Sequence, residues 1–295
     1  NSPCFVIAEI GNNHNGNIDL AKQLVDAAID SGADCVKFQM RNIKSLYKNQ
    51  GNDYDSSADL GDQYTLDLLS RFQLSNEELF EVFDYCKDKG KMPLCTPWDL
   101  DSLSALENYG MQAYKVASAD LTNLELLAAI ARTEKTMICS TGMSTEIEIQ
   151  QAVDFLQNLN AQYILLHCNS TYPTPYRDVN LRYLGKLSLI NQGGIVGYSG
   201  HERGYLAATL AVALGAKVVE KHFTIDKNRE GNDHKVSLLP FEFKKMVEVA
   251  CHGKCINSLP IGGIDRPGFG SKIGLVQHQR PEESRRSEGG STKKS

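Results

Sequence analysis

Polar and charged residues recur at the ends of short apolar runs along this chain of 295 residues. A buried core would not choose such residues, and side chains of these types hold anions, bind metal ions or transfer protons where they meet. Their chemistry therefore depends on whether the fold brings the ends of the runs together. The residues in question are Glu9, Lys37, Gln39, Thr96, Lys115, Ser118, Asp120, Ser140, Gly142, His167, Ser199, His201, Glu220 and His222.

His201 and His222 end two successive runs, so their imidazoles could converge on one divalent ion if these runs are neighbouring strands. Two imidazoles with a carboxylate nearby, Glu220 or Asp233, and open water positions suit Mn²⁺, Fe²⁺, Co²⁺ or Zn²⁺ better than Mg²⁺, which prefers oxygen ligands. The alternative is that the two histidines pack or form hydrogen bonds separately, and their spacing leaves this open.

Lys37 and Lys115 lie on two different apolar runs, and paired ammonium groups inside a pocket would favour an anionic ligand. Ser140-Thr-Gly142 runs into a helical pattern that begins near Thr145, which offers hydroxyls, backbone N–H groups and a helix N-terminus to a phosphate. A lysine at the end of a run is more often an ordinary surface group, so this interpretation requires both side chains to point inward. The pocket is then predicted to have an anion side and a metal side.

Short strand-like runs alternate with longer amphipathic segments, which is typical of α/β proteins. No G-x-G-x-x-G follows any run, so we expect one (β/α)₈ TIM barrel rather than two dinucleotide-binding domains. In that fold the carboxyl ends of the strands carry the catalytic groups. The predicted strands are Phe5–Ile10, Cys35–Gln39, Met92–Thr96, Ala113–Val116, Thr136–Ser140, Tyr163–His167, Ile195–Tyr198 and Val218–His222.

Helical patterns lie between the runs, and two of them start with a capping box, Ser75 with Glu78 and Thr145 with Glu148. We expect the barrel to occupy residues 1–258, with a polar excursion at 41–74 over its mouth and a linker or tail at 259–295. The predicted helices are Asp19–Ser31, Asn76–Lys89, Leu121–Ala131, Thr145–Leu159, Tyr205–Leu214 and one near Phe241–Cys251.

Composition limits the partners of the protein. With 41% hydrophobic and 23% charged residues the chain is an ordinary globular one, and no apolar run approaches the ~20 residues of a membrane span. The net charge of −5 argues against a nucleic-acid partner. Most of the eight cysteines lie inside apolar segments and the N-terminal residues do not resemble a signal peptide, so we expect reduced thiols and a cytoplasmic protein.

An ordered set of motifs from about residue 5 to residue 255 resembles the sialic acid synthase family, whose members condense phosphoenolpyruvate with N-acetylmannosamine or a related sugar into nine-carbon 2-keto acids. The motifs are Ala8-Glu-Ile-Gly-Asn-Asn-His-Asn-Gly16, Val36-Lys-Phe-Gln39, Thr96-Pro97, Tyr114-Lys-Val-Ala-Ser-Ala-Asp120, Ser140-Thr-Gly-Met143, Leu166-His-Cys168, Tyr172-Pro-Thr-Pro175, Gly197-Tyr-Ser-Gly-His201, Glu220-Lys-His-Phe-Thr224 and Asp233-His234.

This resemblance implies a role for each matching residue. Lys37 would meet the carboxylate of phosphoenolpyruvate, and Lys115, Ser118, Ser140 and Gly142 would hold its phosphate. His201 and His222 would carry the metal, commonly Mn²⁺, with Mg²⁺ or Co²⁺ as substitutes. The residues expected to line the sugar and the intermediate are Glu9, Gln39, Tyr172, Ser199, Glu220 and Asp233, with Glu9 or Glu220 as the candidate base.

Relatives also carry a C-terminal antifreeze-like domain that reaches across a homodimer, and the sequence resembles the linker before it at Glu283–Ser287, after which we expect that domain to be absent. Two alternatives remain for the function. One is another barrel aldolase, which would use a metal ion or a Schiff base on Lys115 or Lys37. The other is a ligand-binding barrel that has lost turnover. The acceptor sugar and the physiological metal stay open.

Overall fold

The computed structural model describes residues 4–43 and 69–258, with side chains up to residue 250. In this part of the chain, parallel strands close into a barrel in which each strand pairs with the next and β8 pairs with β1. The strands are β1 (Phe5–Gly11), β2 (Cys35–Met40), β3 (Met92–Pro97), β4 (Ala113–Val116), β5 (Thr136–Ser140), β6 (Tyr163–Cys168), β7 (Val196–Gly200) and β8 (Val218–His222).

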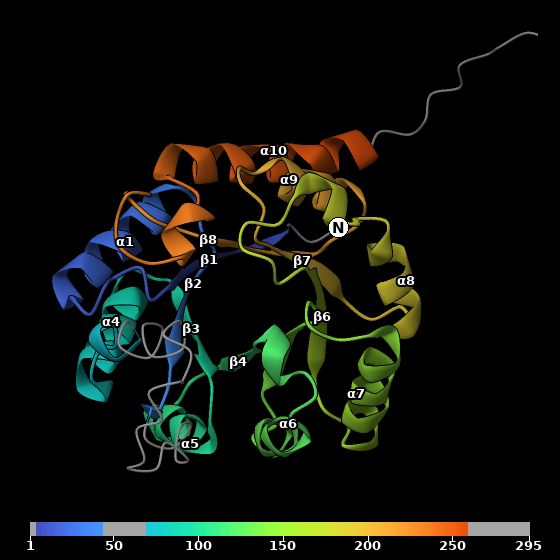
Figure 1. Ribbon diagram of the computed structural model, residues 1–295, viewed down its shortest axis with the longest axis horizontal. Helices are drawn as coiled ribbons and strands as arrows, with labels where there is room; N and C mark the ends of the chain where they lie inside the picture. The colour runs from blue at the N-terminus through green and yellow to red at the C-terminus, as the bar shows by residue number, and fades with distance from the viewer. Residues whose placement is uncertain (1–3, 44–68, 259–295) are drawn as a thin grey trace, which may run out of the picture. The chain divides into compact units, whose positions relative to one another are not determined.

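Helices surround this barrel on the outside, as Figure 1 shows. The architecture is the (β/α)₈ barrel that the alternation of patterns predicted. The α-helices are α1 (Ile18–Asp30), α4 (Asn76–Asp88), α5 (Leu100–Tyr109), α6 (Leu124–Ala131), α7 (Glu146–Asn158), α8 (Tyr183–Ile190), α9 (Leu206–Ala213) and α10 (Pro240–Ser258), and the 3₁₀ helices are η1 (Ser118–Asp120), η2 (Tyr176–Asp178) and η3 (Asp233–Lys235).

Local sequence determines where several helices begin. The Ser75 hydroxyl accepts a hydrogen bond from the backbone N–H of Glu78, whose carboxylate accepts one from the backbone N–H of Ser75. Thr145 and Glu148 form the same reciprocal pair at the start of α7. Each pair satisfies two N–H groups that the first turn would leave free. Both capping boxes predicted from the sequence are confirmed.

The interior of the barrel changes character along its strands. Because alternate residues of a strand face the same side, each strand sends every second side chain inward. The lower interior layer is a separate apolar cluster, formed by Ile7, Cys35, Leu94, Ala113, Ile138, Leu166 and Val218. The residue two positions further along most of these strands is polar and buried, namely Glu9, Lys37, Thr96, Lys115, Ser140 and Glu220. The barrel therefore has an apolar floor and a polar mouth.

Several element boundaries differ from the prediction, among them those of β7 and α6. Strand β7 covers Val196–Gly200 rather than Ile195–Tyr198, because its pairing with β8 continues to the last residue of β7. Helix α6 begins later than predicted, at Leu124, because the preceding residues form the 3₁₀ helix η1. The side chain of Asn123 then caps α6 by accepting a hydrogen bond from the backbone N–H of Leu126.

Two predicted regions fall outside the described residues, wholly or in part. The excursion predicted at 41–74 includes residues 44–68, and the linker or tail predicted at 259–295 is not described at all. Within the described part of the chain, none of the helices combines the length and the apolar character that crossing a bilayer requires.

Candidate active site

The polar mouth of the barrel encloses a pocket of about 230 Å³. It lies at the carboxyl ends of the strands, where enzymes of this fold place their reactive groups. Almost all the residues singled out in the sequence converge here from different strands. Those that line the pocket are Glu9, Lys37, Gln39, Thr96, Lys115, Ser118, Ser140, Tyr172, Ser199, His201, Glu220 and His222.

Lys37 is buried in this pocket with carboxylates on two sides. Its Nζ lies 3.2 Å from Glu9 Oε2 and 3.6 Å from Glu220 Oε1. It also donates a hydrogen bond to Thr96 Oγ1 at 3.2 Å. Burial alone would lower the pKa of Lys37, but Glu220 and Glu9 outweigh it and raise the pKa above its usual value. Lys37 is therefore a permanent cation in the absence of a ligand.

Lys115 is equally buried but has fewer counter-charges. Its Nζ donates to Ser140 Oγ at 2.7 Å and to the Val116 carbonyl at 2.8 Å, and lies 4.0 Å from Glu220 Oε1. Burial, together with repulsion from Lys37, lowers the pKa of Lys115. Burial would raise the pKa of Glu220, but Lys115 and Lys37 lower it to about 2. The two cations thus share one ionised carboxylate.

In each of the two pocket carboxylates, Glu9 and Glu220, one oxygen accepts a hydrogen bond and the other does not. Glu9 Oε1 accepts from Gln39 Nε2 at 2.6 Å, and Glu220 Oε1 accepts from Ser199 Oγ at 3.1 Å. The Oε2 atoms of both residues are buried and form no hydrogen bond, although Glu9 Oε2 lies 3.2 Å from the Lys37 ammonium. Buried polar atoms are rarely left unsatisfied, so these oxygens are placed to receive hydrogen bonds from a bound ligand.

Gly142 lies where three side chains crowd together beside the pocket. Its backbone N–H donates to Ser118 Oγ at 3.1 Å. A Cβ atom at this position would lie 2.7 Å from Ser170 Oγ, 2.9 Å from Cys168 Sγ and 3.0 Å from Ser118 Oγ. The absence of a side chain keeps this space open, and α7 begins four residues further on, at Glu146. Hydroxyls, a backbone N–H group and a helix N-terminus are suited to hold a phosphate.

The two histidines lie on the opposite side of the pocket and are held by their neighbours. His201 Nδ1 lies 2.8 Å from the carbonyl oxygen of Asn169, which can only accept, so Nδ1 carries the proton. Burial, together with His222, lowers the pKa of His201 to about 3, so its ring is neutral. The lone pair is then on Nε2, which accepts a hydrogen bond from Tyr172 Oη at 2.7 Å.

His222 completes the pair. Its ring centroid lies 5.4 Å from that of His201, and its buried Nδ1 has no hydrogen-bond partner. Asp233 Oδ2, which enters from η3, is 3.7 Å from this nitrogen. An imidazole oriented by a backbone carbonyl beside an imidazole with an unsatisfied nitrogen is a donor set that fits a divalent ion. Across residues 4–43 and 69–250, however, no three His, Cys, Asp or Glu side chains form a ready metal cluster.

A second chamber of about 330 Å³ adjoins the pocket and contains Asp233. One wall of this chamber, Trp98, was not expected from the sequence. Trp98 follows the Thr96-Pro97 motif and donates a hydrogen bond from Nε1 to Gln39 Oε1 at 3.3 Å. The Arg41 guanidinium lies 4.4 Å from the centre of its ring. The sequence did offer a signal for this wall, because the only Trp in the chain stands just after a strand end. The lining residues that the two chambers share are Gln39, Trp98, Tyr172 and His222.

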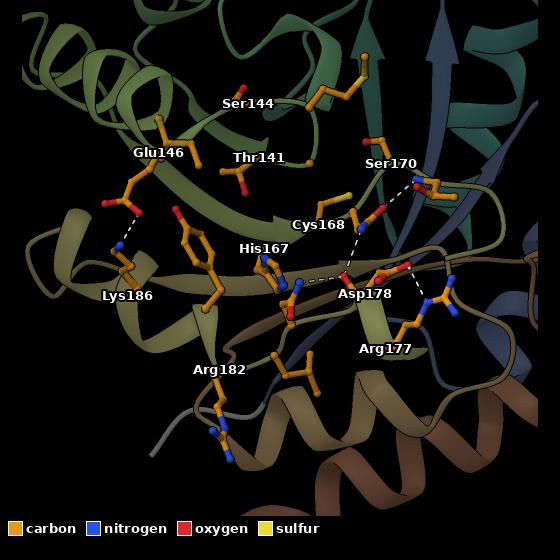
Figure 2. A pocket seen from close by; sticks show the side chains of 18 residues that line it. Thr141, Ser144, Glu146, His167, Cys168, Ser170, Arg177, Asp178, Arg182 and Lys186 are labelled. Carbon is orange, nitrogen blue, oxygen red and sulfur yellow. Dashed lines mark hydrogen bonds and ion pairs between the residues drawn. The ribbon is translucent and has the colours of Figure 1, made fainter. Parts of the chain in front are cut away.

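A wider hollow of about 1140 Å³ lies beside the mouth between the loops that follow β5 and β6, and Figure 2 shows its lining, with Lys186 and Glu146 paired across it. It contains His167, which the sequence analysis placed in the central pocket. That placement was wrong, because His167 faces the outer side of β6, where its Nε2 lies 2.7 Å from the Val179 carbonyl. The next residue, Cys168, faces the central pocket instead.

Comparison with known proteins identifies the family. The model of the NeuB family matches residues 24–254 of this chain. The chain belongs to the NeuB family. This membership agrees with the resemblance to sialic acid synthases that the motifs carried, and the matched region spans β2 to β8 and most of α10.

Individual relatives cover most of this NeuB family chain. It is 45% identical to the Methanocaldococcus jannaschii protein described as uncharacterized protein MJ1065, over 83% of this chain and 69% of that one. It is 40% identical to the N,N'-diacetyllegionaminic acid synthase of Campylobacter jejuni, over 82% and 74% of the two chains. The crystal structure of the N-acetylneuraminic acid synthetase of Leptospira borgpetersenii, in complex with citrate, is 31% identical and superposes with a TM-score of 0.79, over 90% of this chain and 88% of that one.

Proposed function

We propose that this chain is a phosphoenolpyruvate-dependent transferase that forms a C–C bond. In the proposed reaction phosphoenolpyruvate condenses with N-acetylmannosamine or a related N-acyl aldose to a nonulosonic acid, and phosphate leaves by C–O cleavage. One observation carries the proposal: two buried lysines that share one carboxylate line the same pocket as the imidazoles of His201 and His222. The named synthases among the relatives support the reaction class.

The lysines and the space around Gly142 would bind phosphoenolpyruvate. Its three negative charges need buried cations, and Lys37 and Lys115 are both at least 95% buried. Lys37 is assigned to the carboxylate. Lys115, with Ser118, Ser140 and the backbone of Gly142, is assigned to the phosphate. Preorganised donors of this kind stabilise charge without having to rearrange during the reaction.

His201 and His222 would hold a divalent ion, for which Mn²⁺ is the first choice and Co²⁺ or Mg²⁺ the alternatives. When bound there, the ion supplies Lewis acidity toward an aldehyde oxygen. The adjoining chamber, with Asp233 and Tyr172 in its walls, would then receive the polar sugar. The two chambers share His222 and Tyr172, so an aldehyde carbon at their junction would lie close to the enol carbon of phosphoenolpyruvate.

The reaction balances with the groups present. C3 of phosphoenolpyruvate bonds to the aldehyde carbon, whose oxygen gains a proton, and water adds to C2 while losing a proton to a base. The tetrahedral intermediate then breaks its C2–O bond and releases phosphate, leaving the 2-keto acid. We assign the base to Glu9, whose buried Oε2 forms no hydrogen bond and is paired only with the Lys37 ammonium, rather than to Glu220, whose pKa of about 2 makes it a weak base.

The test is phosphate release from phosphoenolpyruvate across a panel of N-acylated aldoses in the presence of Mn²⁺. With ¹⁸O in the bridging position of phosphoenolpyruvate, C–O cleavage puts the label in the phosphate, whereas P–O cleavage leaves it in the keto acid. A Lys115→Ala variant should lose the activity, and a Lys135→Ala variant, altered at the opposite end of the barrel, should keep it. Failure of every aldose to release phosphate would refute the proposal.

One observation favours a second candidate, an aldolase that acts through a Schiff base. Burial lowers the pKa of Lys115, and a buried amine with a lowered pKa is a suitable nucleophile toward carbonyl carbons. Borohydride with pyruvate separates the two candidates. Trapping of pyruvate on Lys115, with loss of activity, would support the aldolase. The proposed synthase forms no such adduct.

A further inference from the structure

A fully buried group of three polar side chains lies behind β7 and β8, on the face of the barrel wall that points away from the pocket. We call Tyr198, Glu202 and Lys221 the outer triad. Lys221 Nζ donates to Glu202 Oε1 at 3.1 Å and to the Glu202 carbonyl at 2.7 Å, and Tyr198 Oη donates to Glu202 Oε2 at 2.7 Å. The side chains of Glu202 and Lys221 are 0% exposed.

The outer triad alternates along the chain with residues of the pocket. Lys221 stands between Glu220 and His222 on β8, and Glu202 directly follows His201 at the end of β7. Because successive residues of a strand face opposite sides, a group that fixes Lys221 also fixes the backbone from which His222 projects. The bond from Lys221 to the Glu202 carbonyl likewise holds the residue next to His201.

Gly200 is the residue that makes room for this arrangement. It pairs with Lys221 across the two strands, immediately before His201. A Cβ atom at this position would lie 2.4 Å from Glu202 Oε2 and 2.5 Å from Tyr198 Cε1. The Glu202 carboxylate can therefore fold back over the end of β7 only because this residue has no side chain.

Stability alone does not account for a buried ion pair. Taking both charges out of water is costly, and replacing such a pair with apolar side chains of similar volume is often neutral or stabilising. What the pair adds is a fixed geometry: two hydrogen bonds from Lys221 join the ends of the two neighbouring strands, and a third, from Tyr198, fixes the Glu202 carboxylate. A pair of imidazoles that must aim at one ion needs this kind of support.

We propose that the outer triad positions His201 and His222 for joint binding of a divalent ion. The inference rests on the proposed function in taking these histidines as the metal ligands. The three residues are positioning residues, since none of them lines the pocket.

The barrel offers a matched control of the same composition. Tyr114 on β4 and Lys135 before β5 both bond to Glu107 of α5: Tyr114 Oη donates to Glu107 Oε1, and Lys135 Nζ lies 2.6 Å from the same oxygen. This second Tyr–Glu–Lys group lies nearer the amino ends of its strands and is partly exposed, at 33% for the Glu107 side chain and 25% for that of Lys135; Tyr114, which is not changed in the control, is its one member next to a pocket residue, Lys115. Its loss removes similar bonds without touching either histidine.

The experiment compares the paired variant Glu202→Gln with Lys221→Met, the paired control Glu107→Gln with Lys135→Met, and the full chain. Calorimetric titration with Mn²⁺ in the absence of substrates should show a dissociation constant 10- to 100-fold higher for the first pair, and an unchanged one for the control. Affinity for phosphoenolpyruvate should stay within about twofold in both pairs, because the lysines are untouched. The value of kcat should fall only in the first pair.

A milder variant, Tyr198→Phe, covers the case in which the paired variant does not fold. Tyr198→Phe keeps both charges and loses one hydrogen bond, and it should weaken Mn²⁺ binding severalfold. A folded paired variant, or Tyr198→Phe, with the Mn²⁺ affinity of the full chain would overturn the inference. If the full chain bound no Mn²⁺, the metal part of the proposed function would fail instead. Crystal structures would then decide the inference, which predicts a displaced His201 and a broken Tyr172–His201 bond in the paired variant only.

Discussion

The two sides of the barrel mouth bury their polar groups in different ways. On the lysine side, Lys37 and Lys115 stay near carboxylates, so that opposite charges compensate the loss of water. On the histidine side, the His201 ring is neutral, and a backbone carbonyl fixes which of its nitrogens carries the lone pair. The lysine side is thus held by attraction between opposite charges, and the histidine side by hydrogen bonds that fix the orientation of a neutral ring.

This difference teaches what each side can tolerate. The attraction between charges falls off slowly with distance, so a lysine can shift by some tenths of an ångström and still hold an anion. A lone pair must point at its partner within tens of degrees. We therefore expect changes on the lysine side to act through charge, and changes on the histidine side to act through geometry, including geometry set from behind the strands.

The largest expected effect comes from removing a charge on the lysine side. Lys37→Ala and Lys115→Ala should each weaken phosphoenolpyruvate binding by roughly 2–5 kcal/mol, because the loss of one buried cation leaves Glu220 facing an anion. Calorimetry with phosphoenolpyruvate measures this, and Mn²⁺ affinity should change little. Unchanged phosphoenolpyruvate affinity in both variants would remove the basis for an anion side, and Lys135→Ala is the control.

Acid should test the neutrality of buried histidines, which His14 shares with His201. Burial lowers the pKa of His14 to about 4 from 6.5, so between these values the unfolded chain takes up a proton that the folded chain does not. Stability is thus unaffected by this group above pH 6.5 and falls as the pH drops toward 4, by about 1.4 kcal/mol per pH unit and about 3 kcal/mol in all.

The measurement is urea unfolding between pH 6.5 and pH 5, where most carboxylates stay ionised. A His14→Asn variant should show a flatter dependence on pH than the full chain, whatever its stability at pH 7. Equal slopes in the two proteins would mean that His14 titrates normally in the folded state, against its burial.

Much of the barrel and its mouth followed from sequence periodicity. Apolar runs with a period of two place Glu9, Lys37 and Lys115 on the inward face, and the structure confirms this placement. His167 was placed in the pocket only because it is polar and stands at the end of a run. The same period of two puts it on the outer face, because it follows Leu166 of the inner layer and precedes Cys168 of the pocket.

Features that depend on tertiary contacts could not be predicted. Helices α5 and α8 were not singled out, although Asp99, which caps α5 by accepting from the backbone N–H of Ser102, was a usable signal. The stacking of Arg41 on Trp98 joins the ends of two strands, and the outer triad joins the backs of two others. Sequence patterns show which residues share a face, but which faces meet behind a strand depends on how the helices pack.

Removing one proposed metal ligand, His222, should affect Mn²⁺ binding without affecting phosphoenolpyruvate binding. His222→Ala should raise the dissociation constant for Mn²⁺ by about 100-fold, since an outer-shell change alone costs 10- to 100-fold, and should abolish turnover. Phosphoenolpyruvate affinity should stay within a few fold, because Glu9 and Glu220, not His222, hold the two lysine side chains. Titration with each ligand alone measures both, and His167→Ala, which alters a buried histidine outside the pocket, is the control.

The smallest expected effect comes from adding a methyl group rather than removing a charge. Gly142→Ala would place a Cβ atom 2.7 Å from Ser170 Oγ and 2.9 Å from Cys168 Sγ, so these side chains must move and the proposed phosphate space narrows. We expect phosphoenolpyruvate affinity to fall about tenfold, or ~1.4 kcal/mol, with Mn²⁺ affinity unchanged. Gly185→Ala in α8 is the matched control, since nothing lies within 4 Å of a Cβ atom there. If Gly142→Ala bound phosphoenolpyruvate normally, the phosphate would have to lie elsewhere on the lysine side, nearer Lys37. If Gly142→Ala weakened Mn²⁺ binding as well, the lysine side and the histidine side would not be independent. The two would then form one coupled site joined through Cys168, whose Sγ lies 3.6 Å from His201 Nδ1.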